Sequence, residues 1–359
     1  MADAILLRDQ TLSEAAHLRI PWKQLVKAFE ILEQMSFAGY DLWLDDWLYY
    51  GQKVIPQDFH ALRGRIRPCS EQVESAHKAG FRKISVVYEQ HVNTGLTENL
   101  VRALRTANNL KLKTAVEIRN ASALSLPELL DLFASLAAFE VQSFIYCDAD
   151  GNLDPFITSA VFEKLLQSVD WPLEFHAHNQ YGLATANCLA AIQAGVKIVN
   201  ASVAGIGIGG HAAHEEIVMA TRRAVPSSFA RMPKLAEPCH AILDCIGIKT
   251  PLTKAIIGVD IFAHESGIHT AGVLKRPELY EAFSPEEVGL SRRLVIGKHS
   301  GKTSLEEKLK QENMVLDAIQ SERLLAKVRQ VAVEQKSPLT DGQLKKLYQD
   351  CVMKQAEGF

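Results

Sequence analysis

The chain has 359 residues, of which 47% are hydrophobic and 23% charged, values typical of globular proteins that exclude a disordered or low-complexity chain. Its 39 lysines and arginines against 42 aspartates and glutamates give a net charge of −3, and no basic stripe indicates nucleic acid or an anionic membrane as a partner. The apolar run at the N-terminus is too short for a signal peptide, and the six cysteines form no Cys-x-x-Cys pair. We therefore expect a cytoplasmic protein with reduced thiols.

Short apolar runs rich in β-branched and aromatic residues alternate with segments of helical period. The runs predicted as strands are 4–7, 41–44, 61–66, 84–89, 114–118, 144–148, 173–178 and 198–203. The helical segments between them include 21–35, 97–107, 127–139 and 184–194. This alternation predicts parallel βαβ units. Eight units over about 235 residues favour an α/β fold of the closed (β/α)8 type, a TIM barrel, over an open sheet.

The composition changes after about residue 231. We predict a barrel domain over 1–231, then a linker and a His- and Tyr-bearing subdomain over 232–303. A charged segment of helical period follows, which predicts a small helical subdomain over 304–359.

Charged and imidazole side chains stand where two of the predicted strands end. Arg8 and Asp9 follow the first strand, and His176 and His178 end the seventh. Alternation along a strand directs the two histidines to the same side. Two imidazoles and a carboxylate suit a divalent ion with open positions for substrate oxygens. The alternatives are a surface ion pair and two buried core histidines.

A glycine-rich segment over 204–210 follows the eighth strand and leads to His211. Its spacing does not match a dinucleotide-binding loop, so we expect the glycines to let the backbone approach a bound metal or ligand. His211 is either a third nitrogen ligand or an ordinary loop histidine. Further along, His, Tyr and Gly residues gather over 258–302 and suggest a second wall of the site, the alternative being a surface helix with incidental histidines.

Taken together, these residues resemble the metal-dependent Claisen-condensing family of homocitrate synthase and isopropylmalate synthase, TIM barrels related to hydroxymethylglutaryl-CoA lyase. The resemblance rests on HAHNQYGLATANCLAAIQAG at 176–195, GVDIFAHESGIHTAGVLKRPELYEAFSPEEVG at 258–289 and IGKHSGK at 296–302. The length is nearest to the short homocitrate synthases, which lack a C-terminal leucine-sensing domain.

The resemblance implies a divalent metal ion, either magnesium, manganese or zinc. Asp9, His176 and His178 match the family's metal ligands, and His211 stands where the family has a metal-side asparagine.

The resemblance also implies substrate-binding roles. Arg8 matches the arginine that steadies the keto oxygen and the enolate, and Arg119 matches the one that pairs with the distal carboxylate of a keto-diacid. Asn179 is a further candidate for substrate binding.

Three residues of the distal segment are implied in proton transfer on acetyl-CoA. His269 is the candidate base, tuned by Glu265 or Tyr280. In the family the His and the Tyr come from the neighbouring subunit, which implies a homodimer whose active site is completed in trans.

Several positions depart from the family pattern. Residues 10–12 lack its glycine and glutamine, and Ala149 replaces a threonine that holds the substrate carboxylate. Because the metal and proton-transfer positions match while the keto-acid pocket does not, we expect a changed acceptor.

The sequence thus predicts an acyltransferase that condenses acetyl-CoA with a 2-oxo acid and releases CoA by hydrolysis. One alternative is a carbon–carbon lyase or aldolase of the same superfamily. Another is a non-catalytic paralogue that binds a keto acid or a partner subunit.

Overall fold

The computed structural model describes residues 4–35, 37–51, 61–89, 96–224, 234–264 and 276–356. The chain divides into two compact units, one within 1–232 and 237–250 and the other within 233–236 and 251–359.

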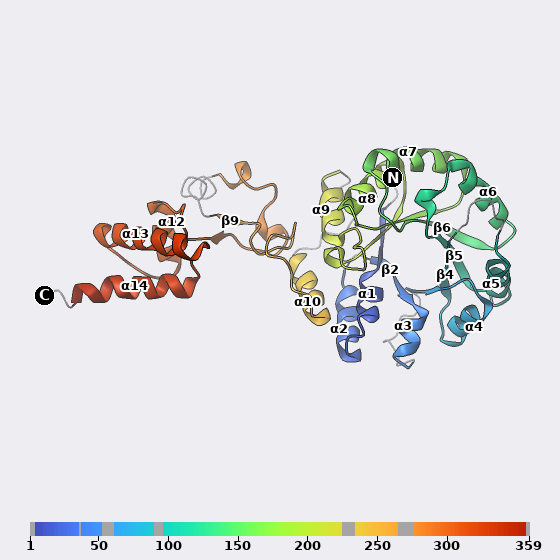
Figure 1. Ribbon diagram of the computed structural model, residues 1–359, viewed down its shortest axis with the longest axis horizontal. Helices are drawn as coiled ribbons and strands as arrows, with labels where there is room; N and C mark the ends of the chain where they lie inside the picture. The colour runs from blue at the N-terminus through green and yellow to red at the C-terminus, as the bar shows by residue number, and fades with distance from the viewer. Residues whose placement is uncertain are drawn as a thin grey trace. The chain divides into compact units, whose positions relative to one another are not determined.

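Eight parallel strands of the first unit close into a barrel in chain order, with β8 paired to β1 (Figure 1). The strands are β1 (Leu6–Asp9), β2 (Phe37–Trp43), β3 (Leu62–Ile66), β4 (Lys83–Tyr88), β5 (Lys113–Ile118), β6 (Val141–Asp148), β7 (Leu173–Ala177) and β8 (Ile198–Ala201). This topology confirms the predicted TIM barrel.

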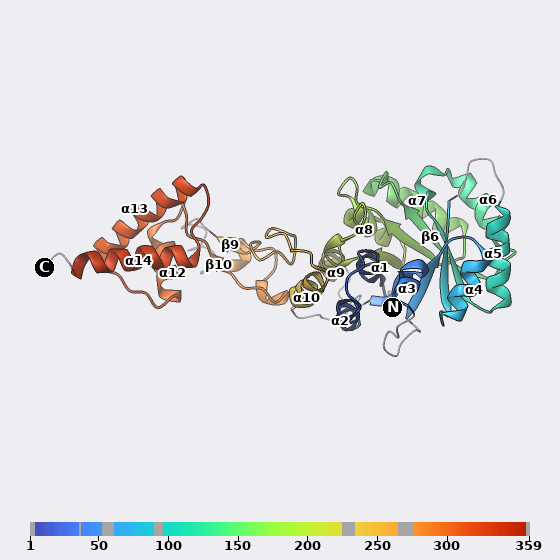
Figure 2. The same cartoon turned by 60° about the horizontal axis from the view of Figure 1, so that its bottom comes forward.

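Helices surround the strands, as the two ribbon views show (Figures 1 and 2). They are α1 (Thr11–His17), α2 (Trp22–Leu32), α3 (Leu44–Tyr49), α4 (Ser70–Lys78), α5 (Glu98–Asn109), α6 (Leu126–Leu136), α7 (Pro155–Ser168), α8 (Ala184–Ala194), α9 (His214–Ala224) and α10 (Ala236–Ile246). Two 3-10 turns, η1 (Ala121–Ala123) and η2 (Val203–Gly205), follow β5 and β8.

Local sequence signals explain where several helices begin and end. The Ser125 side chain accepts a hydrogen bond from the Glu128 N–H while Glu128 reaches back to the Ser125 N–H, and this capping box starts α6. Helix α8 runs over the predicted residues 184–194 and ends at Gly195, whose φ of 117° favours a residue without Cβ. The predicted strand over 41–44 is shifted, because β2 begins at Phe37 and Leu44 already starts α3.

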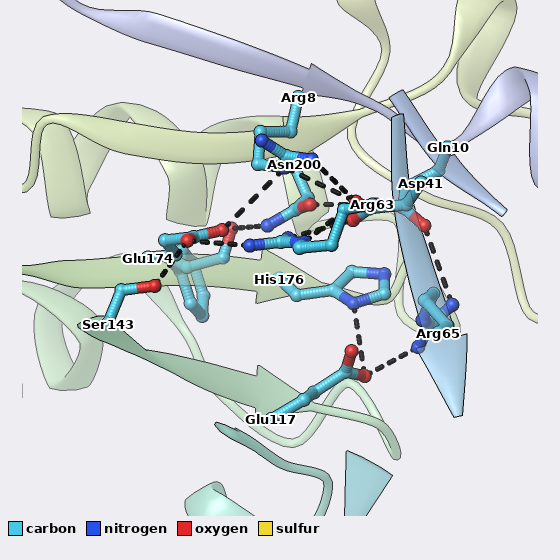
Figure 3. Close-up of polar contacts among 11 residues, drawn as sticks. Arg8, Gln10, Asp41, Arg63, Arg65, Glu117, Ser143, Glu174, His176 and Asn200 are labelled. Atoms are coloured by element: carbon cyan, nitrogen blue, oxygen red, sulfur yellow. Dashed lines mark hydrogen bonds and ion pairs between the residues drawn. The ribbon is translucent and has the colours of Figure 1, made fainter. Parts of the chain in front are cut away.

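The interior of the barrel carries a buried ion network (Figure 3). Arg63 donates to Asp41 through Nε and Nη2, at 2.9 Å each, and to Glu174 through Nη1 at 2.8 Å. Arg8 donates to the same Asp41 from Nη2 at 2.8 Å. Burial disfavours the charged form of Asp41, but the charges of Arg63 and Arg8 outweigh it and hold the pKa of Asp41 well below its ordinary value. Gly39 makes room for this network, since a Cβ there would lie 2.7 Å from the Arg8 Nη1.

The second unit consists of a small parallel pair of strands and a helical part. Strand β9 (Ala263–His264) pairs with β10 (Arg293–Leu294), and two 3-10 turns are η3 (Pro277–Leu279) and η4 (Pro285–Glu287). The helices are α12 (Lys302–Gln311), α13 (Ala318–Gln335) and α14 (Asp341–Ala356). Their common core consists of Ile296, Leu305, Leu309, Leu324, Val328, Ala332, Leu339 and Leu344. Helices therefore form where the charged segment after residue 303 predicts them.

Within the described ranges, no helix has both the length and the apolar character needed to cross a membrane.

The ion network yields a prediction for the stability of the barrel. Replacing Arg63 with Met leaves Asp41 and Glu174 buried without their shared cation, so the free energy of unfolding should fall by about 3–5 kcal/mol. As a control, Arg67→Met breaks only an exposed pair with Asp45 and should cost less than about 1 kcal/mol.

Tryptophan fluorescence during urea unfolding measures this effect, because every tryptophan of the chain belongs to the first unit: Trp22, Trp43, Trp47 and Trp171. Equal destabilisation by the two replacements would refute a structural role of the network.

Candidate active site

A pocket of about 170 Å³ opens where strands of the barrel end. Its lining residues belong to α1, to β2, β3, β5 and β6, and to the segments that follow β5, β7 and β8: Glu14, His17, Trp43, Arg65, Glu117, Arg119, Cys147, His178, Ile208 and His211. The carboxyl end of the strands is the place where functional groups gather in such barrels.

Three imidazoles meet in and beside this pocket. The ring centroids of His176, His178 and His211 lie 4.9–5.1 Å apart in every pairing. His176 Nε2 is 3.3 Å from His211 Nδ1. The predicted convergence of His176 and His178 is therefore present, and His211 joins them.

Carboxylates hold the outer nitrogens of two of these rings. His176 Nδ1 is 3.5 Å from Glu117 Oε1, and His211 Nε2 is 3.3 Å from Glu14 Oε1. When each outer nitrogen donates to its carboxylate, the inner nitrogens that face each other both carry lone pairs. Such an arrangement suits a cation, since a carboxylate behind an imidazole fixes the tautomer of a metal-binding histidine.

Burial keeps two of the imidazoles neutral. It lowers the pKa of His178 to about 2 and, helped by the neighbouring His176, lowers the pKa of His211 as well. Neutral imidazole is the form that binds metal. In the described part of the chain, His178 Nδ1 is buried without a hydrogen-bond partner. The donor set thus fits a divalent ion.

The carboxylates that contact these imidazoles are Glu117 and Glu14, and the metal-binding role of Asp9 stays a prediction. Asp9 is fully buried, and its two oxygens accept hydrogen bonds from the Thr11 N–H at 2.9 Å and the Leu12 N–H at 2.8 Å. Burial raises the pKa of Asp9 to about 7. Asp9 is the last residue of β1, whereas Glu14 lies in the first turn of α1 and contacts His211.

Two predicted substrate-binding residues also have structural partners. Arg8 pairs with Asp41 in the barrel interior and is not among the described residues that line the pocket. The Asn179 side-chain oxygen accepts from the Ala184 N–H at 3.0 Å, at the start of α8.

The arginines that do line the pocket are Arg65 and Arg119. Arg65 extends from β3 over the Trp43 ring, 4.7 Å from its centroid, and donates to Glu117 at 2.6 Å. Arg119 directly follows β5, and its role in substrate binding stays a prediction. A sequence signal for Arg65 exists, because Arg63 and Arg65 are two apart on a strand and point to the same face.

The glycine-rich segment surrounds His211. Gly207 has a φ of 146°, and a Cβ on it would lie 2.5 Å from the His211 Nε2. In the structure Gly207 closely approaches the imidazole of His211, and the approach to a bound metal or ligand stays a prediction.

Three residues of the distal segment are predicted to take part in catalysis. His269 and Glu265 lie outside the described residues. Tyr280 follows η3 in the second unit and is 44% exposed. Its role remains a prediction.

Helix α3 and Tyr50 after it contain acidic and aromatic side chains, none of which is among the described residues that line the pocket. Asp45 pairs with Arg67 at 2.7 Å, and Trp47 is 2% exposed in the packing under the helix. Of the aromatic residues near the end of β2, only Trp43 borders the described pocket.

The chain is similar in sequence to known synthases and to two family models. A family model described as HMGL-like matches residues 60–237, and one described as homocitrate synthase post-HMGL domain-like matches residues 256–336. The 2-isopropylmalate synthase 2 of Caldanaerobacter subterraneus is 38% identical over 259 residues, which cover 72% of this chain and 67% of the relative. The homocitrate synthase of Frankia alni is 37% identical over 279 residues, 72% of this chain and 78% of the relative.

Homocitrate synthase 1 of Nostoc is 42% identical over 224 residues, 62% of this chain and 59% of the relative. Among solved structures, an HMG-CoA lyase from Acinetobacter baumannii superposes with a TM-score of 0.60 at 16% identity, covering 71% of this chain and 96% of the lyase. This last likeness shows the shared barrel fold.

The geometry predicts opposite effects for the two carboxylates of the α1 region. Glu14→Gln should lower the affinity for a divalent ion by about 10- to 100-fold, the loss expected for a carboxylate that orients a metal-binding histidine. Asp9→Asn should leave that affinity unchanged while costing about 1–3 kcal/mol of stability, because one backbone N–H loses its acceptor.

Competition with a chelator measures the affinity, and urea unfolding measures the stability. Loss of metal binding in Asp9→Asn, with retention in Glu14→Gln, would restore the assignment of Asp9.

Proposed function

The chain belongs to the family of homocitrate and 2-isopropylmalate synthases, and we propose that it condenses acetyl-CoA with a 2-oxo acid as an acyltransferase. The observation that carries the proposal is the convergence of three imidazoles, the Glu14 carboxylate and two guanidiniums on one pocket. The lyase reaction is the alternative for such a pocket. The match of residues 256–336 to a homocitrate synthase model favours the synthase.

In this proposal His176, His178 and His211 would hold the metal ion, and Glu14 lies behind His211 as Glu117 lies behind His176. A divalent ion bound there would polarise the keto oxygen of the 2-oxo acid and take up the negative charge that develops on it. The chain's own contribution is to hold the imidazoles neutral and oriented, through Glu117 behind His176 and Glu14 beside His211.

Arg65 and Arg119 bind the carboxylates of the acceptor in this proposal. Guanidinium groups match carboxylates in shape and charge. Two of them in one small pocket favour a 2-oxo diacid, such as 2-oxoglutarate, over a monoacid. Arg65 takes the position of the cation near the reacting carbonyl that the sequence had suggested for Arg8.

Carbon–carbon bond formation needs a base for the acetyl group. The base removes a methyl proton of the thioester, the resulting carbanion attacks the keto carbon, and a proton neutralises the new alkoxide. Water then cleaves the thioester and releases CoA. We propose His269 as the base, tuned by Glu265 or Tyr280, with the His269 and Tyr280 side chains supplied by the second subunit of a cytoplasmic homodimer.

A thiol-release assay tests the reaction. With a divalent ion and acetyl-CoA, release of CoA should depend on a 2-oxo acid and be fastest with a diacid. Arg119→Leu should raise the KM for the diacid by about 10- to 100-fold, the loss expected for a charge-assisted hydrogen bond. Arg102→Leu, which removes an exposed arginine paired with Glu98 on α5, is the matched control.

The assay also separates the alternatives. Cleavage of a 3-hydroxyacyl-CoA without any condensation would assign the lyase reaction. Absence of both reactions in metal-loaded protein would leave only a binding function.

Mixing two inactive variants tests whether the site is completed in trans. His178→Ala disables the barrel site and Tyr280→Phe the distal segment, so subunit exchange should restore roughly a quarter of wild-type turnover in an equal mixture. Persistent inactivity of a mixture shown to contain hybrid dimers would contradict completion in trans.

A further inference from the structure

One thiol of the chain lies beside the imidazoles of the candidate metal site. Cys147 is in β6, where it is the register partner of His176 on the neighbouring strand β7. It is 1% exposed and lines the pocket. Adjacent strands with paired residues direct those side chains to the same face, so the sulfur and the imidazole point into the same layer of the barrel.

The spacing of the donor atoms suits a shared ion. One ligand atom each from Cys147, His176 and His178 lies within 4.8 Å of the other two. It is the one group of His, Cys, Asp and Glu side chains with this spacing that the described residues contain.

We infer that Cys147 is a ligand of this metal centre and that its sulfur selects a zinc-like ion over magnesium. The inference rests on the proposed function, because it concerns the same metal site. Thiolate and imidazole donors suit zinc and cobalt, whereas magnesium requires oxygen ligands in octahedral geometry. Histidines and a carboxylate alone suit several divalent ions, whereas a sulfur ligand favours zinc or cobalt over magnesium.

The surroundings of Cys147 are compatible with metal binding. Arg65 and Arg119 line the same pocket and offset the negative charge of the thiolate that forms.

Cobalt substitution of the full-length chain tests the inference. Cobalt-loaded wild-type protein should show a sulfur-to-cobalt charge-transfer band in the near ultraviolet. Cys147→Ser should abolish the band and lower zinc affinity at least tenfold. Even the loss of a residue that only supports a metal ligand costs 10- to 100-fold in affinity. Cys188→Ser removes a buried thiol of α8 outside the cluster and should leave both unchanged.

Each outcome decides for or against Cys147. A cobalt-loaded wild type without the band overturns the inference even if Cys147→Ser fails to fold, and so does unchanged zinc affinity in folded Cys147→Ser. Release of CoA by a protein without the band refutes the cysteine ligand alone. The band in a protein that releases no CoA refutes the synthase assignment alone.

Discussion

The shared contact of Arg63 with Asp41 and Glu174 is the constraint on which the barrel interior depends. Each of these charges is almost completely removed from water, and a buried charge is tolerated only where partners satisfy it. Ser143 completes the arrangement by donating to Glu174 at 2.8 Å. An apolar interior of similar volume would be as stable, so the network has to be explained by what it positions.

The network continues into the candidate site. Gln10 donates to Asp41 at 2.8 Å, and its side-chain oxygen is 3.5 Å from Arg65 Nη1. Arg65 pairs with Glu117, which in turn faces His176 (Figure 3). The position of an imidazole at the pocket is therefore linked, through polar contacts, to the ion pairs deep in the barrel. These contacts orient His176 through Glu117, and metal-binding histidines require such a hydrogen-bonded partner to hold the ring in place.

The sequence predicts the barrel fold better than it predicts which side chains contact one another in the pocket. Strand–helix alternation indicates the barrel because every unit repeats the same burial pattern, and the alternation of His176 and His178 follows from strand geometry alone. Arg8 and Asp9 lie at a strand end as the sequence predicts, but their partners inside the barrel, Asp41 and the backbone of α1, carry no local sequence signal. Glu14 carries no strand-end signal, since its position depends on how α1 folds back over the strand.

The polar groups of the pocket come from strands on opposite sides of the barrel, and in our proposal they orient the acceptor. His176 and His178 belong to β7 and the segment after it, and Glu14 to the helix after β1. Arg65 and Arg119 come from β3 and from the end of β5. A small acid with a keto group next to one carboxylate satisfies both sides at once, because its carbonyl reaches toward the imidazoles while its carboxylates face the arginines. The arginines that line the described pocket are thus Arg65 and Arg119 and do not include Arg8, so the contacts open to an acceptor differ from those that the family resemblance implies.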